Sequence, residues 1–171
     1  MLKKGLALIV TVVMVLTMVP AAVFAADTPT YSDMPNDWSK TALENAVKNG
    51  LITGYPDATI RAGKSLSRAE MVTIVAKAFG ATTEADISRV QDVKSGDWYY
   101  SYIAKSIGME GMAFATVVRP KDAITREEAF TVLNKVMLLM EGQDVDKSYA
   151  ALNKYSDVSN VSNYARGFVN E

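Results

Sequence analysis

The chain repeats itself at an interval of about sixty residues, and this repetition limits the folds open to it. Asp33 returns as Asp92, 59 positions later, and the segment Leu66–Glu70 returns as Ile124–Glu128, 58 positions later. A third opening segment with the same Tyr-Ser-Asp sequence ends at Asp157. A unit of this size has little core of its own, so we expect neighbouring units to pack against one another.

Within a unit the apolar pattern is helical. Residues 39–49 carry apolar side chains at helical spacing and are followed by a loop rich in turn residues. A second helix is expected to begin at Ser67, and its equivalent at Thr125. Each of these residues stands three positions before a glutamate, Glu70 or Glu128, which is the spacing of a capping box. The sequence therefore predicts an all-α fold built from helix–loop–helix units.

The N-terminus has the pattern of a secretory signal peptide. Lys3 and Lys4 precede an uncharged run that ends in small residues around Ala25. We expect residues 1–25 to be removed, which leaves 146 residues with a net charge of −3. A transmembrane anchor is the alternative, because the uncharged run is long enough to span a bilayer.

Composition excludes most catalytic chemistry. The chain has no histidine and no cysteine, so it cannot form a Ser-His-Asp triad, a thiol nucleophile, a zinc finger or an iron–sulfur cluster. The adjacent Glu127 and Glu128 point about 100° apart on a helix and make a poor acid–base pair. A net charge of −1 argues against nucleic-acid binding. We expect a binding or scaffolding protein without catalytic residues, cofactor or metal site.

Arg68 and Arg126 occupy the first helical position after each capping residue, where a positive charge is unfavourable beside the helix dipole. One explanation is an anion site, in which backbone amides and a guanidinium hold a carboxylate. The other is that each arginine pairs with an aspartate of a neighbouring unit, such as Asp92 or Asp157, and joins the repeats. The position of the two arginines beside the helix dipole is compatible with both explanations.

Aromatic residues gather at the start of the first helix of each unit, at Trp38 and at Trp98 with Tyr99. Their flat faces suit a sugar ring or an interface, although core packing is the commoner role for any one of them. Tyr99 and Tyr100 cannot both face inward on one helix, so at least one of them is expected to be exposed.

These motifs together resemble S-layer homology repeats. The resemblance rests on the Tyr31-Ser32-Asp33 opening, on residues Gly50–Tyr55, and above all on the boxes Ser67–Glu70 and Thr125–Glu128, which match the family's Thr-Arg-Ala-Glu hallmark. It implies three tandem repeats that form a pseudo-threefold helical prism. In this chain the repeats would cover residues 31–80, 90–142 and 153–171; we call these ranges units 1, 2 and 3.

The resemblance also implies a function: non-covalent anchoring of an exported protein to the bacterial cell wall, through an acidic secondary cell-wall polysaccharide that bears pyruvylated N-acetylmannosamine. The protein would be secreted and held at the cell wall, the cell surface or the S-layer. The box arginines would hold the acidic ketal, and the aspartates and aromatics would contact the sugar. Carried over to this sequence, the ligand residues are Arg68, Arg126, Asp33, Asp92, Trp38, Trp98 and Tyr99.

Two departures from the family pattern bear on this expectation. Unit 1 has Ser67 where the family prefers threonine, and unit 3 lacks its second helix, so the chain is expected to be a fragment of a longer protein. Two other functions stay open: a self-assembling surface-layer or envelope subunit, and part of an extracellular glycan hydrolase whose catalytic domain is absent. Self-association is a further expected interaction, whereas nucleic acid is not expected as a partner, nor a membrane once the signal peptide is cleaved.

Overall fold

The computed structural model describes residues 29–111 and 116–170. The predicted signal peptide, residues 1–25, lies outside the described residues. The helices are α2 (Lys40–Lys48), α3 (Arg68–Ala78), α4 (Tyr100–Gly108), α5 (Arg126–Glu141) and α6 (Arg166–Asn170), with 3-10 turns at Leu152–Lys154 and Val158–Asn160. The described residues contain no β-strand, only an isolated bridge between Ser67 and Ala123. The all-α prediction is confirmed, while the threefold prism stays a prediction.

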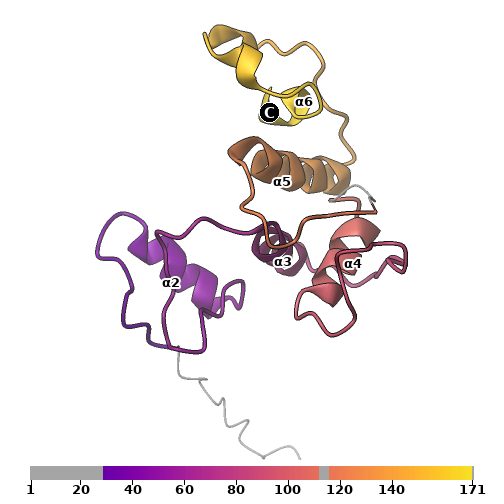
Figure 1. Ribbon diagram of the computed structural model, residues 1–171. Coiled ribbons are helices and arrows are strands. Elements are labelled where there is room, and N and C mark those ends of the chain that lie inside the picture. The colour runs from indigo at the N-terminus through magenta and orange to yellow at the C-terminus, as the bar shows by residue number, and fades with distance from the viewer. Residues whose placement is uncertain (1–28, 112–115, 171) are drawn as a thin grey trace, which may run out of the picture.

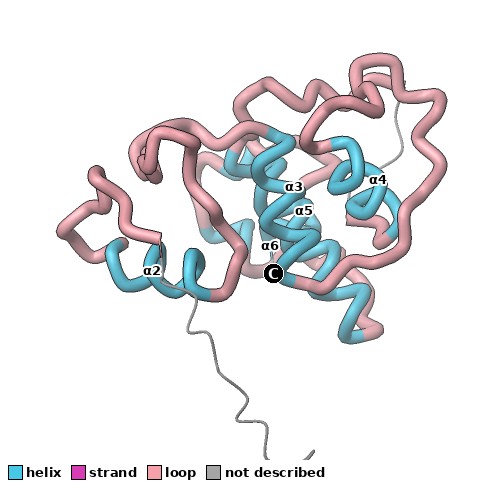
Figure 2. The backbone as a smooth tube through the Cα atoms, turned by 90° about the horizontal axis from the view of Figure 1, so that it is seen from below, coloured by secondary structure: helices cyan, strands magenta, loops and turns pink. Residues whose placement is uncertain are grey.

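Helix α3 is the centre of the packing. Helices α4 and α5 both pack against it, and α6 packs against α5. Helix α2 packs against none of the other described helices, and α3 lies between α2 and α4 in both views (Figures 1 and 2). Long loops connect these short helices (Figure 2). The first helix of units 2 and 3 thus packs on the second helix of the preceding unit.

The main core fills the joint between α3 and α4. Val72 and Ile103 are fully buried there, and Ala69 and Ala104 are each 1% exposed, so small side chains let the two helices approach closely. A second cluster joins α3 to α5 through Val75, Val132 and Val136. These positions recur at three and four residues, which is why they share one face of each helix.

Unit 1 has a small core of its own. Tyr31, Val47 and Ile60 are buried together, with Met34 and Ile52 packed against them. This cluster holds α2 against the loop of unit 1 and not against another helix. The helix that repeats α2 in unit 2 is α4, which is packed on α3, so the same element has a different environment in each unit.

The first turn of α3 is completed by the loop of unit 2. The amide of Arg68 donates to the carbonyl of Asp122, and that of Ala69 donates to Pro120, both at 2.9 Å. The amide of Ile124 donates to Leu66, also at 2.9 Å. Amides at a helix start have no partner within the helix, and here they are used to join two units.

Candidate functional site

A groove of about 740 Å³ lies between unit 1 and the start of α4. One wall is the loop that follows α2, including Thr53, Tyr55 and Arg61; the inner wall is α3, through Thr73 and Lys77. Unit 2 closes the far side. The residues from unit 2 are Trp98, Tyr99, Pro120 and Lys121.

The groove is basic although the chain as a whole is acidic. Its charged lining residues are four cations, Arg61, Lys64, Lys77 and Lys121, and one acid, Glu70. Lys121 is exposed and forms no ion pair within the described part of the chain. A cleft with an excess of one charge attracts ligands of the opposite charge. The groove therefore favours an anionic ligand.

Four of the residues predicted from sequence come together at this groove: Trp98, Tyr99, Ser67 and Glu70. Trp98 is 60% exposed, whereas Tyr99 is buried and supports it edge-to-face, with ring centroids 5.2 Å apart. A supported, exposed indole offers a fixed apolar face to a ligand. The expectation that Tyr99 or Tyr100 is exposed is wrong. Tyr99 is buried, and Tyr100 is half-buried and packs against the same core, because side chains about 100° apart can border one cluster.

Tyr55 organises the charged wall. Its hydroxyl donates to Glu70 Oε1 at 2.8 Å and accepts from Lys64 Nζ at 2.8 Å. The guanidinium of Arg61 lies over the ring, 4.1 Å from its centroid. Arg61 also pairs with Asp57 at 2.6 Å, so its position is fixed from two sides. These contacts hold two cations at the groove edge.

Both capping boxes are formed. Ser67 and Glu70 exchange hydrogen bonds at the start of α3, as do Thr125 and Glu128 at the start of α5. Burial of Glu70 opposes its ionisation, but hydrogen bonds from Ser67, Tyr55 and Lys64 outweigh this and lower the pKa of Glu70 from 4.5 to about 2.

Acid should weaken unit 1 through Glu70. Because its pKa is lower in the folded chain, the ionised carboxylate contributes stability that is present above about pH 4.5 and is lost as the pH falls towards 2. Glu70→Gln should therefore reduce the loss of thermal stability over that range, measured by far-UV circular dichroism. Glu44→Gln, an exposed position on α2, is the control. An equal acid sensitivity of the Glu70→Gln variant and the unsubstituted protein would contradict this role.

The two predicted aspartates bind the protein's own backbone. Asp33 accepts from the amides of Ile60 and Arg61 at 2.6 and 2.8 Å, and Asp92 accepts from those of Val118 and Arg119 at 3.0 and 2.7 Å. Both arginines have φ near +51°, in a region that L-residues seldom adopt. The aspartates thus hold equivalent loop turns, and neither of them lines the groove.

Arg68 joins units 1 and 2. Its Nε donates to the carbonyl of Val118 at 2.8 Å, and its Nη1 pairs with Glu128 Oε1. Arg119 reaches the same carboxylate at 3.3 Å. Of the two explanations for the box arginine, the contacts of Arg68 match the pairing between units, although the partner is Glu128 and not Asp92 or Asp157.

The other predicted ligand residues are separated from the groove. Arg126 is exposed at the start of α5 and has no ion pair or hydrogen-bonded side-chain partner in the described residues. Trp38 is 91% exposed before α2 and does not line the groove. The structure therefore places Arg68, Arg126 and Trp38 at three separate positions.

Several groove residues are not among those predicted from sequence; they include Tyr55, Arg61, Lys64, Lys77 and Lys121. Lys77 comes from the end of α3 and Lys121 from the loop of unit 2. No spacing rule connects them. Tyr55, Lys64 and Lys77 come from the loop and the second helix of unit 1, and packing between units adds Lys121. The only signal in the sequence is the Gly50–Tyr55 segment, which includes Tyr55.

Comparison with known families decides the class of this first unit. The profile of the S-layer homology domain family matches residues 30–72. Residues 30–72 are an S-layer homology domain. The match includes unit 1 from its opening aspartate to the capping box of α3, and therefore most of the loop wall of the groove.

Three relatives show where such sequences occur. The chain is 31% identical over 135 residues to the surface-layer 125 kDa protein of Lysinibacillus sphaericus, covering 77% of this chain and 11% of that protein. It is 26% identical over 145 residues to exoglucanase XynX of Acetivibrio thermocellus, covering 82% of this chain and 13% of the relative. With the cellulosome-anchoring protein of A. thermocellus, identity is 27% over 147 residues, covering 76% and 32%.

The chain thus spans only a small part of these relatives. The S-layer homology domain and the surface-layer relative agree with the predicted class, a secreted protein of the cell surface or cell wall. Among the helices of the described residues, none has the length and apolar character needed to cross a membrane.

Proposed function

We propose that this chain anchors an exported protein non-covalently to the bacterial cell wall by binding an acidic secondary cell-wall polysaccharide in the groove between units 1 and 2. The observation that carries the proposal is the groove itself, which is basic and carries an exposed tryptophan in an acidic chain. Its loop wall belongs to the S-layer homology domain. More specifically, we propose that this polysaccharide carries pyruvylated N-acetylmannosamine.

The groove has the two kinds of group that an acidic sugar needs. The indole of Trp98 offers a face for the apolar side of a pyranose ring. Lys121 and Lys77 lie on the unit 2 and α3 sides and would pair with the carboxylate of the ketal. Lys64 is already bound to Tyr55 and Glu70, so we assign it to shaping the wall.

We assign different roles to the two box arginines, Arg68 and Arg126. Arg68 positions unit 2 against unit 1 through Val118 and Glu128, and so sets the width of the groove. Arg126 is not needed for the unit 1 groove, and its role as an anion contact stays a prediction. The proposed organisation of the chain is a signal peptide over residues 1–25, followed by units 1, 2 and 3.

The activity that we propose for this chain is attachment, and we assign no catalytic role to its residues. The relatives include an exoglucanase, of which this chain covers 13%, and a cellulosome-anchoring protein. A shared segment in proteins with such different names suits an attachment module that accompanies several kinds of cargo.

Trp98→Ala should weaken binding to purified acidic wall polysaccharide about tenfold, or about 1.4 kcal/mol, because it removes the exposed indole face on which the sugar ring would pack. The matched control is Trp38→Ala, the same residue type at the equivalent position of unit 1, which is 91% exposed and outside the groove. Its affinity should be unchanged. Isothermal titration calorimetry measures both, and equal losses in the two variants would refute the placement of the ligand in this groove.

A further inference from the structure

Helix α5 carries an exposed apolar face that no described element covers. It is a helix of 16 residues, and Phe130, Met137 and Met140 are 46%, 40% and 65% exposed on it, with Leu133 half-buried between them. At about 100° per residue these four side chains lie on one face. Their spacing of three and four residues is that of the a and d positions of a heptad repeat.

The two other faces of α5 are already occupied. Val132 and Val136 pack against Val75 of α3. On the side towards unit 3, Glu127 accepts from Ser162, and Asn134 donates to the carbonyl of Phe168. The apolar stripe Phe130–Leu133–Met137–Met140 is therefore a third, separate face.

The equivalent face of helix α3 is covered by other helices. The positions that correspond to Phe130 and Leu133, 58 residues earlier, are Val72 and Val75. They are 0% and 2% exposed, because helices α4 and α5 lie on them. The same face of the repeat is thus a helix-packing surface in unit 1 and open in unit 2.

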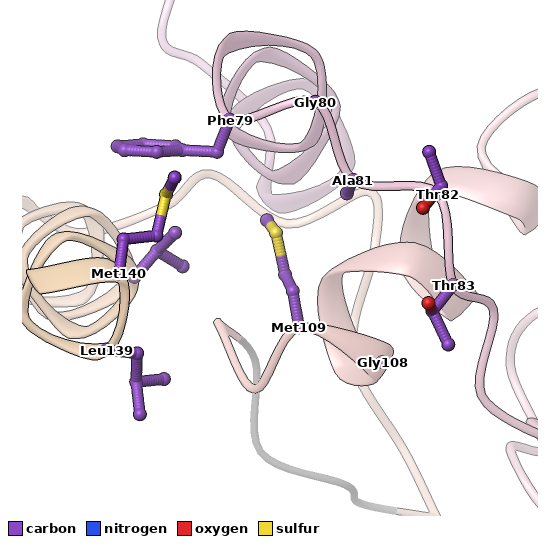
Figure 3. Close-up of a pocket in the computed structure, with 10 residues that line it drawn as sticks. Phe79, Gly80, Ala81, Thr82, Thr83, Gly108, Met109, Leu139 and Met140 are labelled. Carbon is purple, nitrogen blue, oxygen red and sulfur yellow. The ribbon is translucent and has the colours of Figure 1, made fainter. Parts of the chain in front are cut away.

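A pocket of about 300 Å³ adjoins the C-terminal end of the stripe. Its wall is mostly apolar and includes Phe79, Met109 and Met140, with Thr82 and Thr83 at one side (Figure 3). Met109 and Met140 extend from two helix ends towards Phe79 (Figure 3). Methionine side chains adapt to an inserted group and make favourable contacts with aromatic rings.

We propose that the stripe on α5 pairs with the same stripe of a second copy of this chain, with the two helices antiparallel. A pair centred between Leu133 and Met137 sets Leu133 opposite Met137 of the second copy. It also sets Phe130 opposite Met140, beside the pocket at the end of the stripe, which is large enough to receive the ring. Both stripes are then covered, and no charged side chain lies between Phe130 and Met140 on this face.

Charge complementarity favours a second copy in the antiparallel direction. Arg126 lies at the N-terminal end of α5, and the exposed acids Glu141 and Asp144 lie at or just after its C-terminal end. Antiparallel pairing brings Arg126 of each copy to the acidic end of the other, and it also aligns opposite helix dipoles. A parallel pair would instead bring like charges together. This interaction is separate from polysaccharide binding and does not depend on it.

Sedimentation of the purified protein tests the pairing. The unsubstituted protein should sediment as a dimer, and Met137→Lys should sediment as a monomer with an unchanged far-UV circular dichroism spectrum. Val117→Lys, a similarly exposed apolar position outside α5, is the control and should remain dimeric. A monomeric unsubstituted protein at the highest soluble concentration would overturn the proposal, as would a Met137→Lys dimer.

Cysteine crosslinking tests the direction and remains informative if Met137→Lys fails to fold. The chain has no cysteine of its own. Under mild oxidation a mixture of Leu133→Cys and Met137→Cys proteins should form disulfide-linked dimers, and each variant alone should form few. Crosslinking of each variant with itself would indicate a parallel pair, and no crosslinking in the mixture would indicate another occupant of the stripe; either result overturns the proposal.

Discussion

Replacing Ile103 by alanine should lower the free energy of unfolding by about 3 to 4 kcal/mol, a large part of the stability of a domain of this size. Ile103 is fully buried in the core between α3 and α4, beside Ala69 and Val72. The substitution leaves a cavity that these short side chains cannot fill. Chemical denaturation followed by circular dichroism measures the loss.

The repeat offers a matched control for this substitution. Leu43 is the equivalent residue of α2, 60 positions earlier, but it is half-buried and α2 has no helix partner in the described residues. Leu43→Ala should therefore cost about 1 kcal/mol or less. Equal losses at the two positions would show that α2 is packed as tightly as α4, contrary to the structure.

Arg68→Ala should lower the free energy of unfolding by about 2 to 3 kcal/mol. It leaves the Val118 carbonyl without its side-chain donor and removes the Arg68 ion pair from the mostly buried Glu128 carboxylate, which keeps Arg119 and the Thr125 amide as partners. The Arg68 and Glu128 side chains are only 16% and 17% exposed. Arg68→Lys should recover part of this loss, since an ammonium cannot reach both Val118 O and Glu128 with the geometry of a guanidinium.

Arg126 is the matched control for Arg68, at the same helical position of unit 2. It is exposed and unpaired in the described residues, so Arg126→Ala should change the stability of dilute protein by about 0.5 kcal/mol or less. Thermal unfolding of the three variants compares them directly. A loss on Arg68→Ala as small as that on Arg126→Ala would mean that the contact between units contributes little.

Much of the fold follows from local signals in the sequence. The capping boxes at Ser67 and Thr125 mark the starts of α3 and α5, because a cap depends on residues only three positions apart. The heptad-like spacing in α3 and α5 likewise predicts which side chains can be buried. The spacing does not predict which neighbouring element covers these side chains. Val72 and Phe130 are equivalent in the repeat, yet one is fully buried and the other 46% exposed.

The candidate site is less predictable from the sequence, because it also depends on which elements pack together. Trp38 and Trp98 follow the same motif, but only Trp98 has a preceding unit whose loop completes a groove around it. The unfavourable place of Arg68 beside a helix dipole indicates a special role, but its partner, Glu128, is 60 residues away. The lysines of the groove carry no motif. Lys64 and Lys77 come from the loop and helix α3 of unit 1, and the packing of α3 against unit 2 adds Lys121.

The most direct test of the central claim is calorimetric titration of the purified protein with wall polysaccharide, before and after chemical removal of the acidic ketal groups. The basic groove predicts binding to the intact polymer that weakens at high salt and falls at least about tenfold once the acid groups are removed. Equal affinity for the acidic and the neutral polymer would contradict it.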